Sequence, residues 1–146
     1  MQIGNGRYVV AVLVGVLTIA GCGSDGPKTV SRSEFVAKAD AICRASDAKV
    51  SALYERLGER QDDAAILSLV HQAVDIQLSA LNRAREIGEP DSGAASVERL
   101  FDDAEAEFTA AKSAASRADV DRMDKNLEEI LPRIRAWGFK SCGGQG

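Results

Sequence analysis

Apolar residues recur at intervals of three and four along most of the chain after residue 31, which is the period of a helix that buries one face. No stretch shows the strict alternation of apolar and polar residues that marks a half-buried strand. The pattern predicts four helices, over residues 31 to 57, 62 to 87 and 97 to 118, and from 119 or 121 to 137. The fold class is therefore predicted to be all-α.

The ends of the first helix carry residues that satisfy free backbone groups. Ser31 and Glu34 have the spacing of a capping box, in which the hydroxyl accepts from the amide of the third helical residue. Gly58 can adopt the left-handed conformation that commonly ends a helix. After it, Asp62 or Asp63 is expected to cap the second helix.

The last two helices are marked by turn residues and by a regular seam. A loop over residues 88 to 93 contains Gly88 and Pro90, which end the second helix. The apolar positions of the third helix alternate by four and three, and they are Val97, Phe101, Ala104, Phe108, Ala111, Ala115 and Ala118. Asp119 or Asp121 is expected to cap the fourth helix, in which Pro132 predicts a kink or a break between residues 128 and 131. Four helices with short connections favour an antiparallel up-down-up-down bundle.

The first 22 residues have the order of an export signal. Arg7 precedes an apolar run over residues 8 to 20, which is broken only by Gly15 and Thr18 and is followed by small residues before Cys22. The run is shorter than the roughly 20 residues that a helix needs to cross a bilayer. We therefore expect a cleaved signal rather than a permanent membrane span.

The residues Ile19, Ala20, Gly21 and Cys22 resemble the bacterial lipobox. The resemblance implies cleavage between Gly21 and Cys22 and a diacylglyceryl group on the Cys22 thiol, and two or three acyl chains anchor a protein stably. The alternatives are an ordinary secretory signal with an incidental cysteine and an uncleaved short anchor.

The predicted organisation follows from the signal and the helices. It comprises a signal peptide at 1–21, a lipidated N-terminus with an extended polar tether at 22–30, a helical bundle at 31–142 and a disordered tail at 143–146.

Export leaves Cys43 and Cys142 as an even pair in an oxidising compartment, which predicts a disulfide between them. A rise of about 1.5 Å per residue brings Cys142 to roughly the height of Cys43 in an up-down bundle. Two free thiols and an intermolecular pair are the alternatives. The segments 35–43 and 138–143, which contain the two cysteines, resemble the two ends of small, uncharacterised actinobacterial lipoproteins. That resemblance implies a helical exported domain with paired cysteines, and it brings no activity with it.

The charge balance excludes two classes of partner. After removal of the signal, the chain holds 17 basic and 22 acidic residues, and the basic residues form no cluster. Binding to nucleic acid needs clustered Lys and Arg, and so does docking on anionic headgroups. The lipid on Cys22 is therefore the expected link to the membrane.

The sequence contains one histidine, His71, which limits metal and cofactor chemistry. The Glu-x-x-His motif of di-metal bundles is absent because Ser68 stands three residues before His71. A b-type haem held by His71 and Met123 is the cofactor alternative. No Gly-x-Ser-x-Gly motif occurs, so we expect no metal, no cofactor and no catalytic residues.

Two other groups of residues allow a functional and a structural interpretation. The acids Asp102 and Asp103 are sequence neighbours, as are Glu128 and Glu129, and neighbours point about 100° apart on a helix. With Glu105 and Glu107, they are interpreted as solvated helix faces. Trp137 and Phe139 suit an aromatic anchor for a partner, but we expect them to cover the core beside the disulfide.

The sequence thus predicts a non-enzymatic lipoprotein on the extracytoplasmic face of the cell membrane. Its expected role is that of an interaction or structural module with an unknown protein or envelope partner. The alternative is a carrier of small apolar ligands, with a pocket where alanines leave room between the helices. An exposed apolar patch would favour the first role, and an enclosed apolar pocket of a few hundred cubic ångströms would favour the second.

Overall fold

The computed structural model describes residues 28–58 and 62–142. Four helices account for most of them: α1 (Arg32–Leu57), α2 (Asp63–Arg85), α3 (Ala94–Ala111) and α4 (Arg117–Trp137). Two short strands, β1 (Thr29–Val30) and β2 (Glu89–Pro90), form a parallel pair. The all-α prediction is therefore confirmed. The predicted signal peptide 1–21, the lipidation site Cys22 and the tail 143–146 lie outside the described residues.

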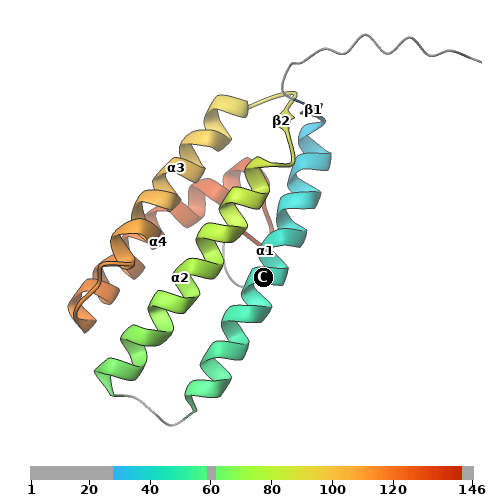
Figure 1. Ribbon diagram of the computed structural model, residues 1–146. Helices are drawn as coiled ribbons and strands as arrows, with labels where there is room; N and C mark the ends of the chain where they lie inside the picture. The colour runs from blue at the N-terminus through green and yellow to red at the C-terminus, as the bar shows by residue number, and fades with distance from the viewer. Residues whose placement is uncertain (1–27, 59–61, 143–146) are drawn as a thin grey trace, which may run out of the picture.

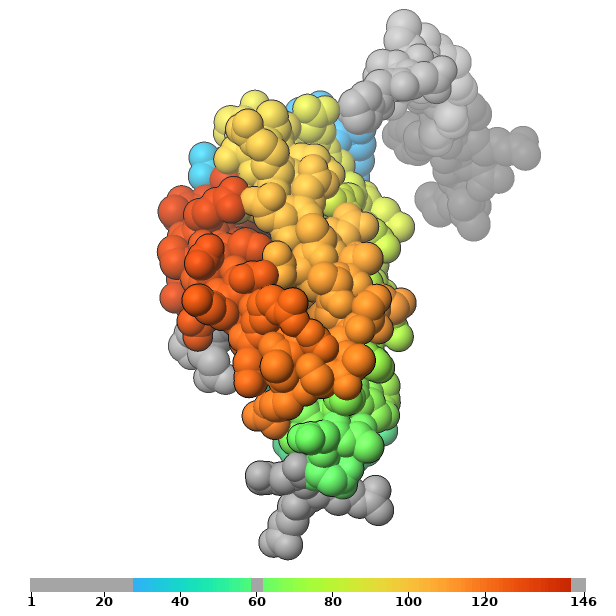
Figure 2. Space-filling model, turned by 90° about the vertical axis from the view of Figure 1, so that its left-hand side faces the viewer, coloured from blue at the N-terminus to red at the C-terminus, as the bar shows by residue number. Residues whose placement is uncertain are grey.

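The second helix is central to the packing. α1 lies along α2, α3 lies along α4, and α2 also contacts α3 and, over a shorter length, α4 (Figure 1). Figure 2 shows α3 and α4 side by side on one face of the molecule. By length and composition α2 is apolar enough to cross a membrane, but core helices meet the same criterion. Because α2 packs against all three other helices, we treat it as a core helix.

The predicted boundaries of α1 and the start of α2 are confirmed. The Ser31 hydroxyl accepts a hydrogen bond from the amide of Glu34 at 3.2 Å, and Gly58 follows the last turn of α1 with a φ of 57°. Of the two candidate caps for α2, Asp62 holds the position, because its carboxylate accepts from the Ala65 amide at 2.9 Å.

The predicted boundary between the third and fourth helices is wrong. α3 ends at Ala111 instead of residue 118, and α4 begins at Arg117, before either predicted cap. Ser116 is the actual cap and accepts from the Asp119 amide, while the Asp119 carboxylate accepts from the amide of Ala115 at 3.1 Å. This reciprocal capping arrangement begins a new helix inside a stretch whose alanines alone would continue the old one.

Of the kink or break predicted at Pro132, the break is absent, since α4 is continuous from Arg117 to Trp137. Pro132 lies on the exposed side of the helix. A proline removes one helical hydrogen bond, and on this side water can reach the carbonyl that loses its partner. The helix therefore passes through the proline.

The predicted tether is ordered at its end, because Thr29 and Val30 pair with Glu89 and Pro90. The amide of Glu89 donates to the carbonyl of Lys28, and the amide of Asp91 donates to that of Val30, both at 2.8 Å. Pro90 fits because the two donors are its neighbours. Residues Lys28 to Val30 therefore belong to the folded domain, which the sequence did not indicate.

Buried apolar residues form two clusters at opposite ends of the helices. The first cluster contains Val30, Phe35, Ala39, Ala84, Val97, Leu100, Phe101, Trp137 and Phe139. The second cluster contains Val70, Val74, Ala111, Ala114 and Val120. Between these residues, Leu81 packs against the first cluster and Leu78 and Phe108 pack against the second. Leu81 and Phe108 also border a cavity described below.

Candidate functional site

The predicted disulfide between Cys43 and Cys142 is present, with the two Cα atoms 5.0 Å apart and 99 positions between them in the sequence. Free thiols and an intermolecular pair are thereby excluded for this structure. The bond joins α1 to the segment that follows α4. In Figure 1 the end of the described chain after α4 lies beside α1.

Asp40 holds the same segment, and sequence reasoning missed it. Its side chain is 5% exposed, and its carboxylate accepts hydrogen bonds from three consecutive amides, those of Lys140, Ser141 and Cys142, at 2.8 to 3.3 Å. Asp40 lies three residues before Cys43 and so shares its helix face. The sequence did contain a signal for this role, because Asp40 lies one turn from a paired cysteine and at the edge of the apolar stripe of α1.

Trp137 and Phe139 cover the core, as predicted, and do not form an exposed anchor. Trp137 is 6% exposed and Phe139 3% exposed, and their rings stack with centroids 5.1 Å apart. Phe35 meets both rings edge-on, and the Arg32 guanidinium lies 4.3 Å from the centre of the Trp137 ring. Gly93 gives the indole room, because a Cβ there would lie 3.1 Å from its nitrogen.

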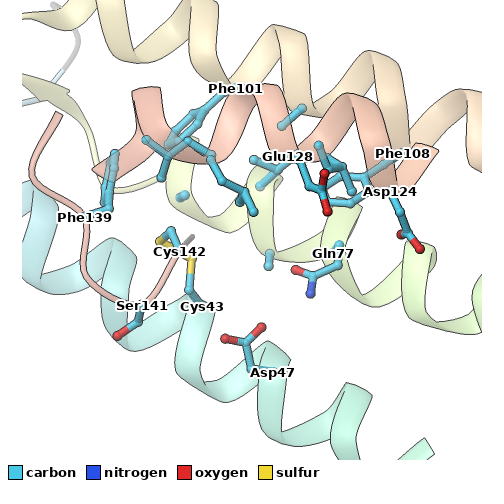
Figure 3. Close-up of a pocket in the computed structure, with 17 residues that line it drawn as sticks. Cys43, Asp47, Gln77, Phe101, Phe108, Asp124, Glu128, Phe139, Ser141 and Cys142 are labelled. Atoms are coloured by element: carbon cyan, nitrogen blue, oxygen red, sulfur yellow. A yellow bond between two sulfur atoms is a disulfide. The ribbon is translucent and has the colours of Figure 1, made fainter. Parts of the chain in front are cut away.

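A cavity of about 460 Å³ lies between the two apolar clusters, beside the disulfide (Figure 3). All four helices and the segment after α4 contribute to its lining. The lining residues are Cys43, Asp47, Gln77, Ala80, Leu81, Ala84, Phe101, Ala104, Phe108, Asp124, Leu127, Glu128, Leu131, Ile134, Phe139, Ser141 and Cys142. Most of them are apolar, as in sites for small organic ligands.

Small side chains on the central helices explain why the space is open. Ala80 and Ala84 of α2 and Ala104 of α3 are buried residues that line the cavity with only a methyl group each. The disulfide and the Asp40 hydrogen bonds both hold α1 to the segment after α4, so these two walls are tied together at one end. A space between helices fixed in this way does not close by a small movement of one helix.

Five polar side chains interrupt the apolar lining, and none is basic; one of them, Ser141, belongs to the segment after α4. Asp47 comes from α1, Gln77 from α2, and Asp124 and Glu128 come from α4. Figure 3 shows Asp47, Gln77 and Asp124 toward the end of the cavity away from Phe139. The acidic side chains therefore gather toward one end of the cavity, where Phe108 also lies, while Phe101 and Phe139 lie toward the other end.

The surroundings of the two aspartates raise their pKa values. Burial raises the pKa of the Asp47 carboxyl, against a smaller opposite effect of its hydrogen bond with Gln77. Asp124 stays exposed at the mouth of the cavity, yet partial burial of its carboxyl raises its pKa, and the negative charges of Asp121 and Glu128 add to this, while Arg117 opposes it. Both effects are expected where carboxylates meet an apolar wall.

The residues considered for haem are engaged in packing. His71 Nε2 lies 3.1 Å from the carbonyl oxygen of Ala114, and this nitrogen therefore acts as a donor. Met123 packs against the second apolar cluster. Among residues 28–58 and 62–142, no group of three or more His, Cys, Asp or Glu side chains is arranged to hold a metal ion.

The acids of α3 bind basic residues of the neighbouring helices. Asp102 pairs with Arg85 of α2 at 2.9 Å, whereas Asp103 pairs with Arg133 of α4 at 2.7 Å. Glu105 also binds Arg85, at 2.5 Å. The prediction that Asp102 and Asp103 do not share a face is confirmed, but these acids connect helices instead of forming a purely solvated surface.

Comparisons with protein-family models, with curated proteins and with solved structures find no match for this chain. Its function therefore has to be argued from the cavity and from the sequence.

Proposed function

We propose that this protein is a lipid-anchored, extracytoplasmic binding protein that holds a small apolar ligand in the cavity between its helices. The observation that carries the proposal is the cavity of about 460 Å³ with its mostly apolar lining. This volume is within the range of roughly 300 to 1,000 Å³ that ligand pockets have. The sequence offered such a carrier as its alternative, and the size and apolar lining of the cavity support it, although the cavity is partly open to solvent rather than enclosed.

The described surface gives less support to a module that docks on a protein. Among the described residues, Tyr54 is the large apolar side chain that stands exposed, at 55%. A single exposed aromatic is ordinary on a soluble protein, whereas partner sites present contiguous apolar patches. The aromatic residues Trp137 and Phe139, which could have anchored a partner, lie inside.

The location outside the cytoplasm is proposed from the sequence. The lipobox resemblance at residues 19–22 implies a lipid on Cys22, and a disulfide persists in an oxidising compartment. We interpret the four helices as the predicted up-down bundle, with α1 and α4 spread apart by the cavity and linked through Cys43 and Cys142. The β1–β2 end would then face the membrane, because β1 follows directly from the lipidated segment.

Ligand binding can be tested with the neutral fluorescent probe N-phenyl-1-naphthylamine. The test uses the mature chain with Cys22→Ser, which keeps every other residue but takes no lipid. We expect saturable binding at one site per chain. The variant Ala104→Leu extends a side chain into the cavity and should abolish binding, whereas Ala106→Leu, two residues along on the exposed side of α3, should not.

Two results would contradict the proposed function. The first is an absence of saturable probe binding to a folded protein. The second is equal binding by the Ala104→Leu and Ala106→Leu variants, since that would place the probe outside the cavity. Circular dichroism of both variants establishes that they keep the helical fold.

A further inference from the structure

We propose that the ligand is an amphiphilic cation, with an apolar body and one ammonium group that binds at the acidic end of the cavity. This inference rests on the proposed function and specifies the ligand class. It follows from which charged groups line the cavity and from where they lie.

Carboxylates reach the cavity from two walls that face each other. Asp47 comes from α1, and Asp124 and Glu128 come from α4, one helical turn apart. No Lys, Arg or His is among the described residues that line the cavity. None of these three acids forms an ion pair with another described residue. Most of the other acidic residues on the helices do form one.

A carboxylate that meets an apolar wall outside an ion pair loses part of its hydration. The Gln77 hydrogen bond at Asp47 and the charge of Arg117 near Asp124 offset this loss only in part. The raised pKa values of Asp47 and Asp124 have this loss as their first cause. A bound ammonium group would supply the missing opposite charge, and charge-assisted hydrogen bonds are stronger than neutral ones. A carboxylate head, as in a fatty acid, would meet like charges at the same place and be disfavoured.

The other end of the cavity suits the apolar body. Phe101 and Phe139 and the disulfide lie there, with Leu131 and Ile134 of α4 on the same lining. A molecule that lies lengthwise would therefore have its apolar part against aromatic and aliphatic side chains and its head between α1 and α4 (Figure 3). The arrangement therefore favours a ligand that is apolar at one end and charged at the other. A purely apolar ligand would leave the carboxylates without an ion-pair partner.

The test compares three ten-carbon probes that differ in their heads: decylammonium, decanol and decanoate. Each is titrated by calorimetry into the mature Cys22→Ser chain at neutral pH, below its micelle concentration. We expect decylammonium to bind roughly tenfold or more tightly than decanol, which corresponds to one charge-assisted hydrogen bond. Decanoate should bind most weakly. Ala104→Leu should abolish binding of the ammonium probe, and Ala106→Leu should leave it unchanged.

Charge-removing variants identify the groups responsible. In Asp47→Asn and Glu128→Gln the preference for the ammonium probe over decanol should fall severalfold, while decanol affinity stays the same or rises. Glu129→Gln is the matched control, because Glu129 neighbours Glu128, carries the same charge and does not line the cavity. A loss of preference in Glu129→Gln as large as in Glu128→Gln would overturn the inference, because it would reflect net charge alone.

The outcomes separate this inference from the proposed function. If decanol and decanoate bind as tightly as the ammonium probe and Ala104→Leu abolishes all binding, the cavity binds ligands and the inference about the cation is wrong. If the ammonium probe binds equally well to Ala104→Leu, it binds on the surface, and the inference is again wrong. If neither these probes nor N-phenyl-1-naphthylamine bind, the proposed function itself fails.

Discussion

Loss of the disulfide should remove a large part of the stability of the domain. The perturbation is the double variant Cys43→Ala with Cys142→Ala, compared with the oxidised protein. The bond joins residues 99 positions apart, so it closes a loop of almost the whole described domain. In the chain-entropy model a loop of about 100 residues corresponds to about 4.7 kcal/mol at 25 °C. Domains of this size have about 5 to 15 kcal/mol in all.

The measurement is urea denaturation, followed by helical circular dichroism and by fluorescence of Trp137, the single tryptophan of the chain. We expect the free energy of unfolding to fall by about 4 to 5 kcal/mol in the double variant. Both cysteines are only half-buried, so their truncation to alanine should add little. A fall of less than about 1 kcal/mol would refute the chain-entropy reasoning.

Asp40 offers an internal check on the disulfide, because it holds the same segment through the amides of Lys140, Ser141 and Cys142. In the oxidised protein Asp40→Ala leaves buried amides without acceptors, which costs about 1 to 3 kcal/mol for each such group. Without the disulfide the segment is free to leave α1, and the same substitution should cost less. Additive effects of the two changes would contradict the view that they act on one structural element.

Three further predictions concern other parts of the chain. The hydrogen bond from Ser116 holds the pKa of Asp119 below its usual value, so this carboxylate stabilises the fold at neutral pH, and the effect is lost as pH falls through the lowered pKa. The variant Asp119→Asn should therefore be less stable than the native chain at pH 7 and equally stable in strong acid. The midpoints of urea denaturation at the two pH values measure this difference. Gly88 has a φ of 117°, and a Cβ at this position would lie 2.2 Å from a backbone oxygen. The variant Gly88→Ala should therefore lower the unfolding free energy by at least about 1 to 3 kcal/mol. Gly58→Ala is the control and should cost less, because a Cβ at Gly58 would have no atom within 4 Å. Mass spectrometry of the membrane fraction should find an acylated N-terminal Cys22, and a mature chain that retains the residue before it would exclude lipidation.

Local signals in the sequence were reliable where one residue satisfies the hydrogen-bonding groups of the adjacent backbone. Ser31, Gly58 and Asp62 mark the ends of α1 and the start of α2, because capping depends on a few adjacent backbone groups. The third helix was predicted too long, since its alanine run has no local feature that ends a helix as clearly as a glycine does. The cap at Ser116 was overlooked in favour of the aspartates that follow it.

The candidate site was predictable only in part. The pairing of Cys43 with Cys142 could be inferred by counting, because assigning Cys22 to the expected lipid leaves two cysteines and one intramolecular choice. A pocket between helices was anticipated from alanines, and Ala104 does line it. The acids that line it were not anticipated, since Asp47 and Glu128 look in sequence like any other charge on a helix surface.

The sequence by itself determined the number of helices, the pairing of the cysteines and, through residues 19–22, the expectation of a lipid anchor. These depend on periodicity, composition and spacing, which are properties of neighbouring residues. Only the tertiary structure decided that the apolar residues divide into two clusters with a cavity between them, and that Asp47 and Asp124 share this cavity. The physical reason is that a cavity and its charge depend on how far apart helices lie after all their contacts are satisfied. No local pattern of residues encodes that distance.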